Sequence, residues 1–233
     1  MGDGLMVKVG KVRIMELLEP EFFGTVLNHN ISVIENGPCG GLMMIDTGLP
    51  GYLDQIESYL KAWGYSLEDI SDIVITHWHH DHAGNAMAIK RISDAKIYAH
   101  VDELGDLENP PKYSTIYSDE LGVSLPVFKR TMERINKLHY EPVKVDFALK
   151  GGEDLGGFRV IHVPGHTKGH IALFDGKCLV VGDAVRNVRN KLSPPLRIFS
   201  WNYELAVNSF NYLISLPYTV LIPFHGDIVI RNF

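Results

Sequence analysis

Thr76-His77-Trp78-His79-His80-Asp81-His82-Ala83-Gly84-Asn85 is a stretch that places four histidines and one aspartate within six residues. A short, β-branched apolar run over residues 73–76 leads into it and predicts a buried strand. Because successive side chains of a strand point to opposite faces, His77 and His79 leave the strand end on the same side. The rest of the motif enters a helix that we expect to begin near Ala83. Metal-binding side chains held between a strand end and a helix start predict a site of fixed geometry.

Length and composition indicate a single domain over residues 1–233, since 45% apolar residues are enough for one core of moderate size. The net charge of −6 argues against general binding to nucleic acids or acidic membrane surfaces. Cys39 and Cys178 are the only cysteines in the sequence and cannot form a disulfide framework, so we expect a cytoplasmic protein. The N-terminus lacks the apolar core of a signal peptide, and no run of about 20 apolar residues predicts a transmembrane helix.

Hydrophobic periodicity predicts a β-rich chain with several helices. We expect strands at residues 5–18, 31–35, 42–45, 73–76, 95–99, 143–149, 158–163, 171–174, 179–181 and 218–222. We expect helices at residues 51–63, 85–92, 126–138 and 202–214, and a strand break at Glu19-Pro20-Glu21. Two similar β-rich runs, each followed by a helix, suggest two packed halves.

The stretch over about 101–142 is expected to be a cap inserted into the domain. Its first part, residues 101–125, looks irregular, and a helix follows. Inserted segments of this kind often shape substrate pockets.

Further polar residues stand where apolar strands are expected to end, at Asp46, His166, Asp183 and His225. Loops at one edge of a sheet sandwich lie close together in space. We therefore expect these four side chains to converge on the histidine-rich motif.

A resemblance to the metallo-β-lactamase superfamily rests on five motifs in the family's order: Asp46, His77-x-His79-x-Asp81-His82, His166, Asp183 and His225. They span nearly the whole chain. The resemblance implies an α+β fold, a four-layer αββα sandwich of two mixed β-sheets with helices outside. It also implies a metal site at one edge of that sandwich.

Two divalent metal ions are implied by the same resemblance, with Zn²⁺ favoured and Fe or Mn as alternatives. The implied ligands are His77, His79 and His166 for one metal and Asp81, His82 and His225 for the other, with Asp183 bridging both. A hydroxide bridging the two metals would be the nucleophile, and Asp81 would also help to orient it as a catalytic residue. Asp46 would orient a ligand histidine from behind.

Several residues carry alternatives that the sequence leaves open. His170 either supports the ligands, faces the substrate or is structural. Arg186, in the basic loop after Asp183, either binds an anionic group of the substrate or belongs to a solvated loop. Tyr203 either lines the pocket or packs elsewhere. His29 is expected to be an ordinary structural histidine, and His80 has the wrong parity for a ligand.

Four departures from particular relatives bear on the substrate. Asp183 stands where true β-lactamases commonly carry Cys or Ser, which argues against β-lactams. The run over residues 166–170 resembles glyoxalase II and lactonases, with Lys168 in place of proline. We do not expect the glutathione-binding region of glyoxalase II, because the sequence ends at Phe233, and Arg186 replaces the lactonase tyrosine.

The leading hypothesis is therefore a dinuclear metal-dependent hydrolase of a small ester, thioester or lactone. The alternative is a mono-iron persulfide dioxygenase of the same superfamily, in which His77, His166 and Asp183 would hold the iron. A phosphodiesterase ranks below both, and flavo-diiron oxygen reduction ranks lowest. We expect a small-molecule substrate, no nucleic-acid or membrane partner, and leave open a homodimer.

Overall fold

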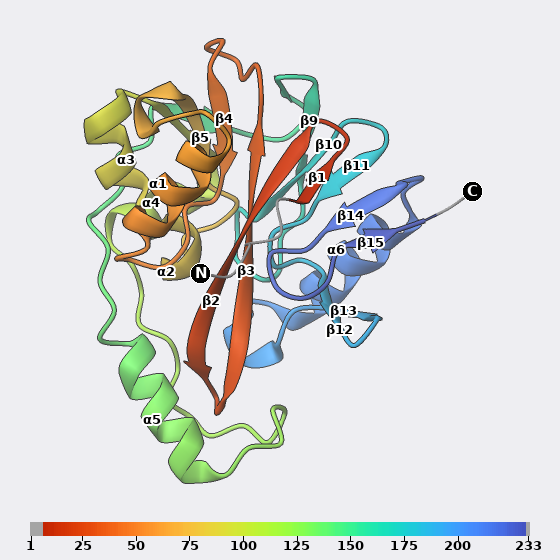
Figure 1. Cartoon of the computed structure of the whole chain (residues 1–233). Helices are drawn as coiled ribbons and strands as arrows, with labels where there is room; N and C mark the ends of the chain where they lie inside the picture. Colours follow the sequence, from red (N-terminus) through yellow and green to blue (C-terminus); the bar gives the residue numbers. More distant parts are fainter. Residues whose placement is uncertain (1–6, 232–233) are drawn as a thin grey trace.

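The computed structural model describes residues 7–231 as two β-sheets packed face to face, with helices on the outside (Figure 1). The first sheet has the order β1-β2-β3-β4-β5-β6-β7. Its strands are β1 (Val7–Val9), β2 (Val12–Phe22), β3 (Thr25–Ile34), β4 (Leu42–Ile45), β5 (Ile70–Val74), β6 (Lys96–His100) and β7 (Phe147–Leu149). Neighbours are antiparallel from β1 to β4 and parallel from β4 to β7.

The second sheet has the order β15-β14-β11-β10-β9-β8. Its strands are β8 (Asp154–Leu155), β9 (Phe158–His162), β10 (Ile171–Phe174), β11 (Cys178–Val180), β14 (Val220–Ile222) and β15 (Val229–Ile230). The β11–β14 pair is parallel and the other pairs are antiparallel, so both sheets are mixed.

Helices cover the outer faces of both sheets (Figure 1). Those on the first sheet are α1 (Leu53–Ala62), α3 (Ala86–Ser93) and α4 (Leu104–Glu108), and the helix on the second is α6 (Tyr203–Ser215). On β5, Ile73 faces the helices while Val74 faces the second sheet. Burial on both faces explains why this strand is a continuous apolar run. These layers confirm the predicted αββα sandwich.

Parallel strands bring the loops that carry the predicted ligands to one edge of the first sheet. The carboxyl ends of β4, β5 and β6 lie side by side there, so Asp46 and His77 become neighbours. The second sheet joins this edge through main-chain hydrogen bonds, from Ile171 N to Thr76 O (3.1 Å) and from Asn30 N to Phe224 O (2.8 Å). We call these loops, residues 46–49, 75–85, 163–170, 181–185 and 223–226, the ligand edge.

Residues 109–142, which we call the cap segment, extend beyond the sandwich beside the turn that joins β2 and β3 (Figure 1). Within this segment α5 (Leu125–Ile135) buries Phe128 and Met132 in a small separate apolar cluster with Phe23. Residues 101–108 depart from the expected irregular structure and form η2 (Val101–Glu103) and α4. Periodicity missed α4 because it has five residues, of which one, Leu107, is buried.

Some predicted boundaries are wrong. Strand β2 continues through Pro20 to Phe22, with a register irregularity between Glu19 and Phe22. Proline is tolerated at such an irregularity because no ladder hydrogen bond is required there. Of the strand predicted at residues 143–149, residues 143–146 lie outside β7. Residues 5–6, the start of the strand predicted at residues 5–18, are outside the described residues.

A further hairpin, β12 (Arg186–Val188) and β13 (Lys191–Ser193), was not predicted. Its strands have three residues each, too few for a period to show. Its turn residues Arg189 and Asn190 adopt positive φ values of 54° and 60°. The turn contains no glycine, the residue by which such turns are usually predicted from sequence.

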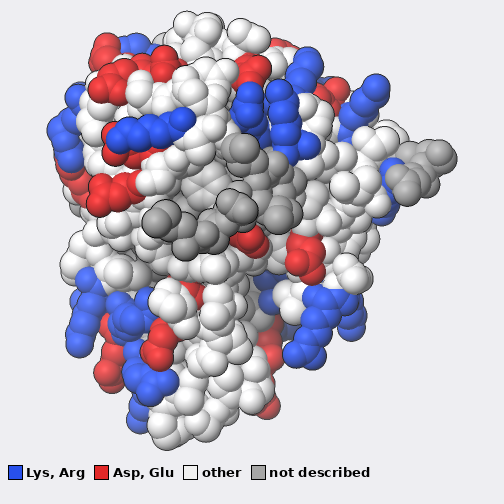
Figure 2. Space-filling model, in the orientation of Figure 1, with Lys and Arg blue, Asp and Glu red and all other residues white. Residues whose placement is uncertain are grey.

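The described surface carries mixed charge. Figure 2 shows Lys and Arg side chains interspersed with Asp and Glu over one face. Among residues 7–231, none of the helices combines the length and apolar character that crossing a bilayer requires.

Candidate metal centre

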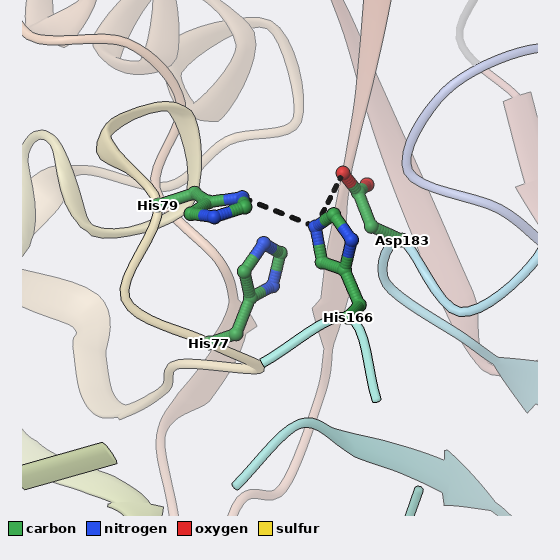
Figure 3. A group of neighbouring side chains, drawn as sticks. All are labelled: His77, His79, His166 and Asp183. Carbon is green, nitrogen blue, oxygen red and sulfur yellow. Dashed lines mark hydrogen bonds and ion pairs between the residues drawn. The ribbon is translucent and has the colours of Figure 1, made fainter. Parts of the chain in front are cut away.

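Four of the predicted ligands meet at the ligand edge from three separate loops (Figure 3). His77 and His79 follow β5, His166 lies between β9 and β10, and Asp183 follows β11. One donor atom from each lies within 4.8 Å of the others. His166 Nε2 is 3.1 Å from His79 Nδ1 and 3.4 Å from Asp183 Oδ2. Three imidazoles and a carboxylate around one point have the composition of a zinc or iron site.

A second group shares Asp183 with the first. His82 Nε2 and His225 Nε2 each lie 3.4 Å from Asp183 Oδ1. Asp81 Oδ2 lies 3.2 Å from His225 Nε2 and 3.7 Å from His82 Nε2. The two oxygens of Asp183 therefore face two adjacent donor groups, as a bridging carboxylate would.

The outward nitrogen of several ligand imidazoles is fixed by a partner behind the site. Asp46 Oδ2 lies 2.8 Å from His82 Nδ1, and Thr76 Oγ1 lies 3.1 Å from His77 Nδ1. His225 Nδ1 lies 2.9 Å from the carbonyl oxygen of Asn28. Such partners fix the orientation and tautomer of a ligand histidine, which leaves Nε2 directed into the site.

Asp46 stands at the centre of this support. Its carboxylate accepts hydrogen bonds from the Thr76 main-chain N–H (2.8 Å) and the Thr76 hydroxyl. Its backbone has a φ of 62°, a left-handed conformation that aspartate tolerates better than most residues. Asp46 thus lies behind the candidate ligand His82, and its role in orienting a ligand histidine stays a prediction.

The end of the histidine motif anchors the short helix α2 (His80–Ala83). A Cβ atom on Gly84 would lie 2.4 Å from the Gly48 carbonyl oxygen, so a side chain cannot fit there. Asn85 donates its amide hydrogens to the carbonyl oxygens of Thr47 (2.6 Å) and Leu49 (2.8 Å). Gly84 and Asn85 therefore lock α2 against the loop after β4.

The residues present fit a divalent cation. Within the described chain, the buried atoms His77 Nε2, His82 Nε2 and Asp183 Oδ1 have no hydrogen-bond partner. Buried polar atoms of this kind normally have one, and here they point toward the shared centre. A metal ion in the first group would satisfy His77 Nε2, and one in the second group would satisfy His82 Nε2 and Asp183 Oδ1.

The electrostatics suit the same ion. Burial lowers the pKa of His77 and His79 well below the ordinary value, and neighbouring imidazoles add to the shift, so both stay neutral and able to coordinate. Burial opposes ionisation of Asp183, but the nearby His225 and His82 outweigh it and hold the pKa of that carboxyl well below its usual range. His77 and His79 are therefore neutral beside an ionised Asp183. Burial alone would lower the pKa of His82 and His225, but neighbouring carboxylates outweigh it and raise both pKa values, so a metal ion would have to displace a proton from these two imidazoles.

Glu103 was missed by the sequence reasoning. Its carboxylate is fully buried and accepts main-chain hydrogen bonds from Trp78 (2.8 Å) and Gly169 (2.7 Å). One carboxylate thus joins the loop of His77 and His79 to the loop of His166. Burial is the main cause that raises the pKa of Glu103 to about 7. A glutamate in a stretch that looked irregular gave no signal of this role.

His29, expected to be an ordinary structural histidine, also lies at the site. It is fully buried on β3, with Nε2 3.6 Å from Glu19 Oε2 and 4.0 Å from Asp81 Oδ2. Donor atoms of His29, Asp81 and His225 lie within 4.8 Å of one another. The polar run Asn28-His29-Asn30, interrupting an apolar strand, was the signal that could have revealed it.

The remaining predicted residues take different places. His170 is buried behind the ligands, where its Nε2 accepts a hydrogen bond from the Asp183 main-chain N–H (3.1 Å). His80 contacts the Tyr113 hydroxyl at 2.8 Å. Arg186 borders the cavity described next, and its Nε donates to the Pro194 carbonyl oxygen (3.0 Å). Tyr203 is not among the residues that line this cavity, and its ring lies 4.1 Å from the Arg197 guanidinium.

A cavity of about 430 Å³ opens directly onto the candidate ligands. His79, Asp81, Asp183 and His225 form one side of it. Its volume lies within the range of small-molecule sites. The ligand edge therefore faces a space in which a substrate can bind.

The chain belongs to the metallo-beta-lactamase superfamily, because the model of that family matches residues 24–225. This confirms the resemblance drawn from the motifs. Together with the His/Asp cluster, it defines a metal-dependent enzyme of the metallo-hydrolase type.

Similar proteins carry related names. The chain is 29% identical over 201 residues to the probable metallo-hydrolase YflN of Bacillus subtilis, covering 79% of this chain and 75% of that protein. It is 32% identical over 199 residues to a hydroxyacylglutathione hydrolase of Hyphomonas neptunium, covering 82% of this chain but 59% of that enzyme. This chain therefore spans less than two thirds of the latter relative.

Solved structures support the fold. A metallo-beta-lactamase family protein from Thermus thermophilus superposes with a TM-score of 0.70 at 20% identity, covering 94% of this chain and 75% of that chain. TTHA1623 in a di-iron-bound form has a TM-score of 0.63 at 23% identity and covers 93% of both chains.

Proposed function

We propose that this protein is a dinuclear metal-dependent hydrolase of a small ester, thioester or lactone. The observation that carries the proposal is Asp183, whose two carboxylate oxygens each face a separate group of donor atoms. The relatives named as metallo-hydrolase and hydroxyacylglutathione hydrolase support hydrolysis as the reaction type.

Seven side chains are proposed to hold the two ions. One ion would be held by His77, His79, His166 and Asp183, and the other by Asp81, His82, His225 and Asp183. When bound, the ions would supply a hydroxide nucleophile at neutral pH and a positive charge that stabilises the developing oxyanion. Zn²⁺ suits this donor set, as do Fe and Mn.

The protein's own side chains would orient the reacting water and the substrate. Asp81 is largely buried at the cavity wall, where its carboxylate could accept a hydrogen bond from a water molecule and orient it toward the substrate carbonyl. In the net reaction water adds to the carbonyl carbon, and the bond to the leaving oxygen or sulfur breaks. An ester or thioester releases its alcohol or thiol with a proton and its acyl group as a carboxylic acid, whereas a lactone opens to a single hydroxy acid.

The test is elemental analysis of the purified protein together with a panel of thioesters, lactones, phosphodiesters and persulfides. We expect two metals per chain and hydrolysis within the first two classes. His79→Ala should lower the metal content and reduce kcat/KM by at least about 1,000-fold, since a ligand is lost from the centre. His139→Ala, which alters an exposed histidine, is the control.

Two outcomes would contradict the proposal. Full activity and full metal content in His79→Ala would show that the metal centre is not where it is assigned. One iron per chain, with oxygen consumption on a persulfide, would instead identify the dioxygenase reaction.

Arg186 is proposed to bind an anionic group of the substrate. It borders the cavity, and burial lowers the pKa of its guanidinium while the nearby Asp183 opposes the shift. Arg186→Ala should raise KM for an anionic ester about tenfold while leaving that for a neutral ester unchanged. Equal changes in KM for both esters would show that Arg186 supports the structure of its loop and does not bind the substrate.

A further inference from the structure

The cavity over the ligand edge has two chemically different sides. The side formed by candidate metal ligands is polar, as described above. The rest of the lining includes half-buried and buried apolar side chains: Phe22, Phe23, Leu121, Val123, Ile135 and Phe199. We call these six residues the apolar wall.

Three distant parts of the chain build the apolar wall. The turn between β2 and β3 contributes Phe22 and Phe23, whose rings lie 4.8 Å apart at 82°. The short helix η3 (Arg197–Phe199) contributes Phe199, 6.2 Å from each of those rings. The cap segment provides the other three residues. Edge-to-face aromatic packing of this kind gives a preformed surface.

Charged groups near the apolar wall are already occupied. Glu19 is paired with Arg134 and faces His29, away from open solvent. Arg186 and Arg189 lie on the β12–β13 hairpin instead. A polar or charged substrate group placed on the apolar wall would lose its hydration without gaining a partner there, which is unfavourable.

We propose that the cavity selects substrates whose acyl group is an apolar chain, lying on the apolar wall while its carbonyl carbon reaches the candidate metal centre. The proposal rests on the hydrolase function above and adds the identity of the acyl group. Three observations carry it: the cavity is continuous from Asp81 and Asp183 to Phe199, its volume of about 430 Å³ suits a small molecule, and part of its lining is apolar.

A series of S-acyl-N-acetylcysteamine thioesters tests the proposal, with acetyl, butanoyl, hexanoyl and octanoyl groups on one constant thiol. Each methylene that the apolar wall covers should raise kcat/KM about fourfold, so hexanoyl should exceed acetyl by on the order of 100-fold. A second series of acetate esters with lengthening alcohols should show no such rise.

Two variants locate the effect. Phe199→Ala removes one ring and should lower kcat/KM for the hexanoyl thioester about tenfold, with less than a twofold change for acetyl. Leu121→Trp fills space in the cavity and should shift the preferred chain toward acetyl and butanoyl. Phe147→Ala, an exposed phenylalanine on β7 outside the cavity, is the matched control.

Binding of octan-1-ol to metal-free protein, measured by calorimetry, separates this proposal from the hydrolase function. Binding that Phe199→Ala weakens and Phe147→Ala leaves unchanged would support the apolar site even if no thioester is hydrolysed. Thioester hydrolysis with a flat chain-length profile would retain the hydrolase and overturn the acyl-group proposal.

Three further outcomes would also overturn it. Equal losses on acetyl and hexanoyl thioesters in Phe199→Ala would make the ring structural. A chain-length preference in the alcohol series in place of the acyl series would place the leaving group on the apolar wall. Absence of octanol binding, with sedimentation showing that Phe199→Ala dissociates a dimer, would make the wall an interface between two copies.

Discussion

The ligand edge and the cap segment both line the same cavity, yet different forces hold them. At the ligand edge, buried hydrogen bonds from Asp46, Thr76 and Glu103 fix the loops that carry the donor atoms. In the cap segment, Phe128 and Met132 pack in an apolar cluster. Directional bonds fix atoms to fractions of an ångström, whereas apolar packing sets volume and shape.

This difference teaches how the cavity can combine fixed chemistry with an adaptable pocket. A metal centre tolerates little displacement of its ligands, so its supports are hydrogen-bonded and buried. A wall that accommodates a substrate chain needs the right volume and apolar character. We therefore expect substitutions at the ligand edge to change metal binding, and those in the cap segment to change stability or substrate choice.

The largest effect should come from a substitution at the ligand edge, of Glu103, on the free energy of unfolding and its dependence on pH. Its raised pKa, about 7, means that the folded protein holds a proton that the unfolded chain releases near pH 4.5. The stabilisation is therefore complete below about pH 4.5 and disappears as pH rises through 7, a loss of up to about 3 kcal/mol. Glu103→Gln cannot titrate, so the difference in unfolding free energy between the metal-free wild type and this variant should fall across that range.

Urea denaturation at pH 5 and pH 8 measures this difference, and Glu108→Gln, at an exposed position of α4, is the control. A difference between wild type and Glu103→Gln that does not change with pH would show that Glu103 does not bind a proton in this window.

Asp46→Asn should have the next largest effect, on metal affinity. The asparagine amide would have the same shape as the carboxylate but would form a weaker hydrogen bond with His82 Nδ1. In the wild type this nitrogen lies 2.8 Å from a carboxylate oxygen of Asp46. Loss of such a support typically lowers metal affinity 10- to 100-fold. Competition with a chromophoric chelator measures it, with Asp119→Asn in the cap segment as control. Unchanged affinity in Asp46→Asn would contradict the assigned support.

Arg134→Ala should have the smallest effect on stability. This effect should be limited to the cap segment. Arg134 on α5 bonds to the Glu19 carboxylate and the Glu21 carbonyl oxygen, and its removal should cost about 1 kcal/mol. Hydrogen exchange should quicken in α5 but not at the Trp78 and Gly169 amides. Arg130→Ala, exposed on the same helix, is the control. Faster exchange at both places would mean that the two regions unfold together.

Much of the fold followed from local patterns. The continuous apolar runs at residues 42–45 and 73–76 predicted buried strands, and β4 and β5 lie there within a few residues. Boundaries failed where an element was very short, as in α4 and β12, because three to five residues do not display a period. The strand break expected at Pro20 failed because an irregularity in the β2–β3 pairing accommodates the ring.

The sequence by itself predicted the sandwich and most of the candidate donor residues, since strand periodicity and the histidine motif are local properties of the chain. Tertiary structure alone decided which groups stand behind the ligands and what faces them. Glu103 reaches Gly169 across 66 residues, and Asn28 meets His225 across 197. The apolar wall likewise joins three segments that no local pattern connects. Contacts of this kind depend on how the sheets and the cap segment pack, because burial gives a side chain its partners only once the chain has folded.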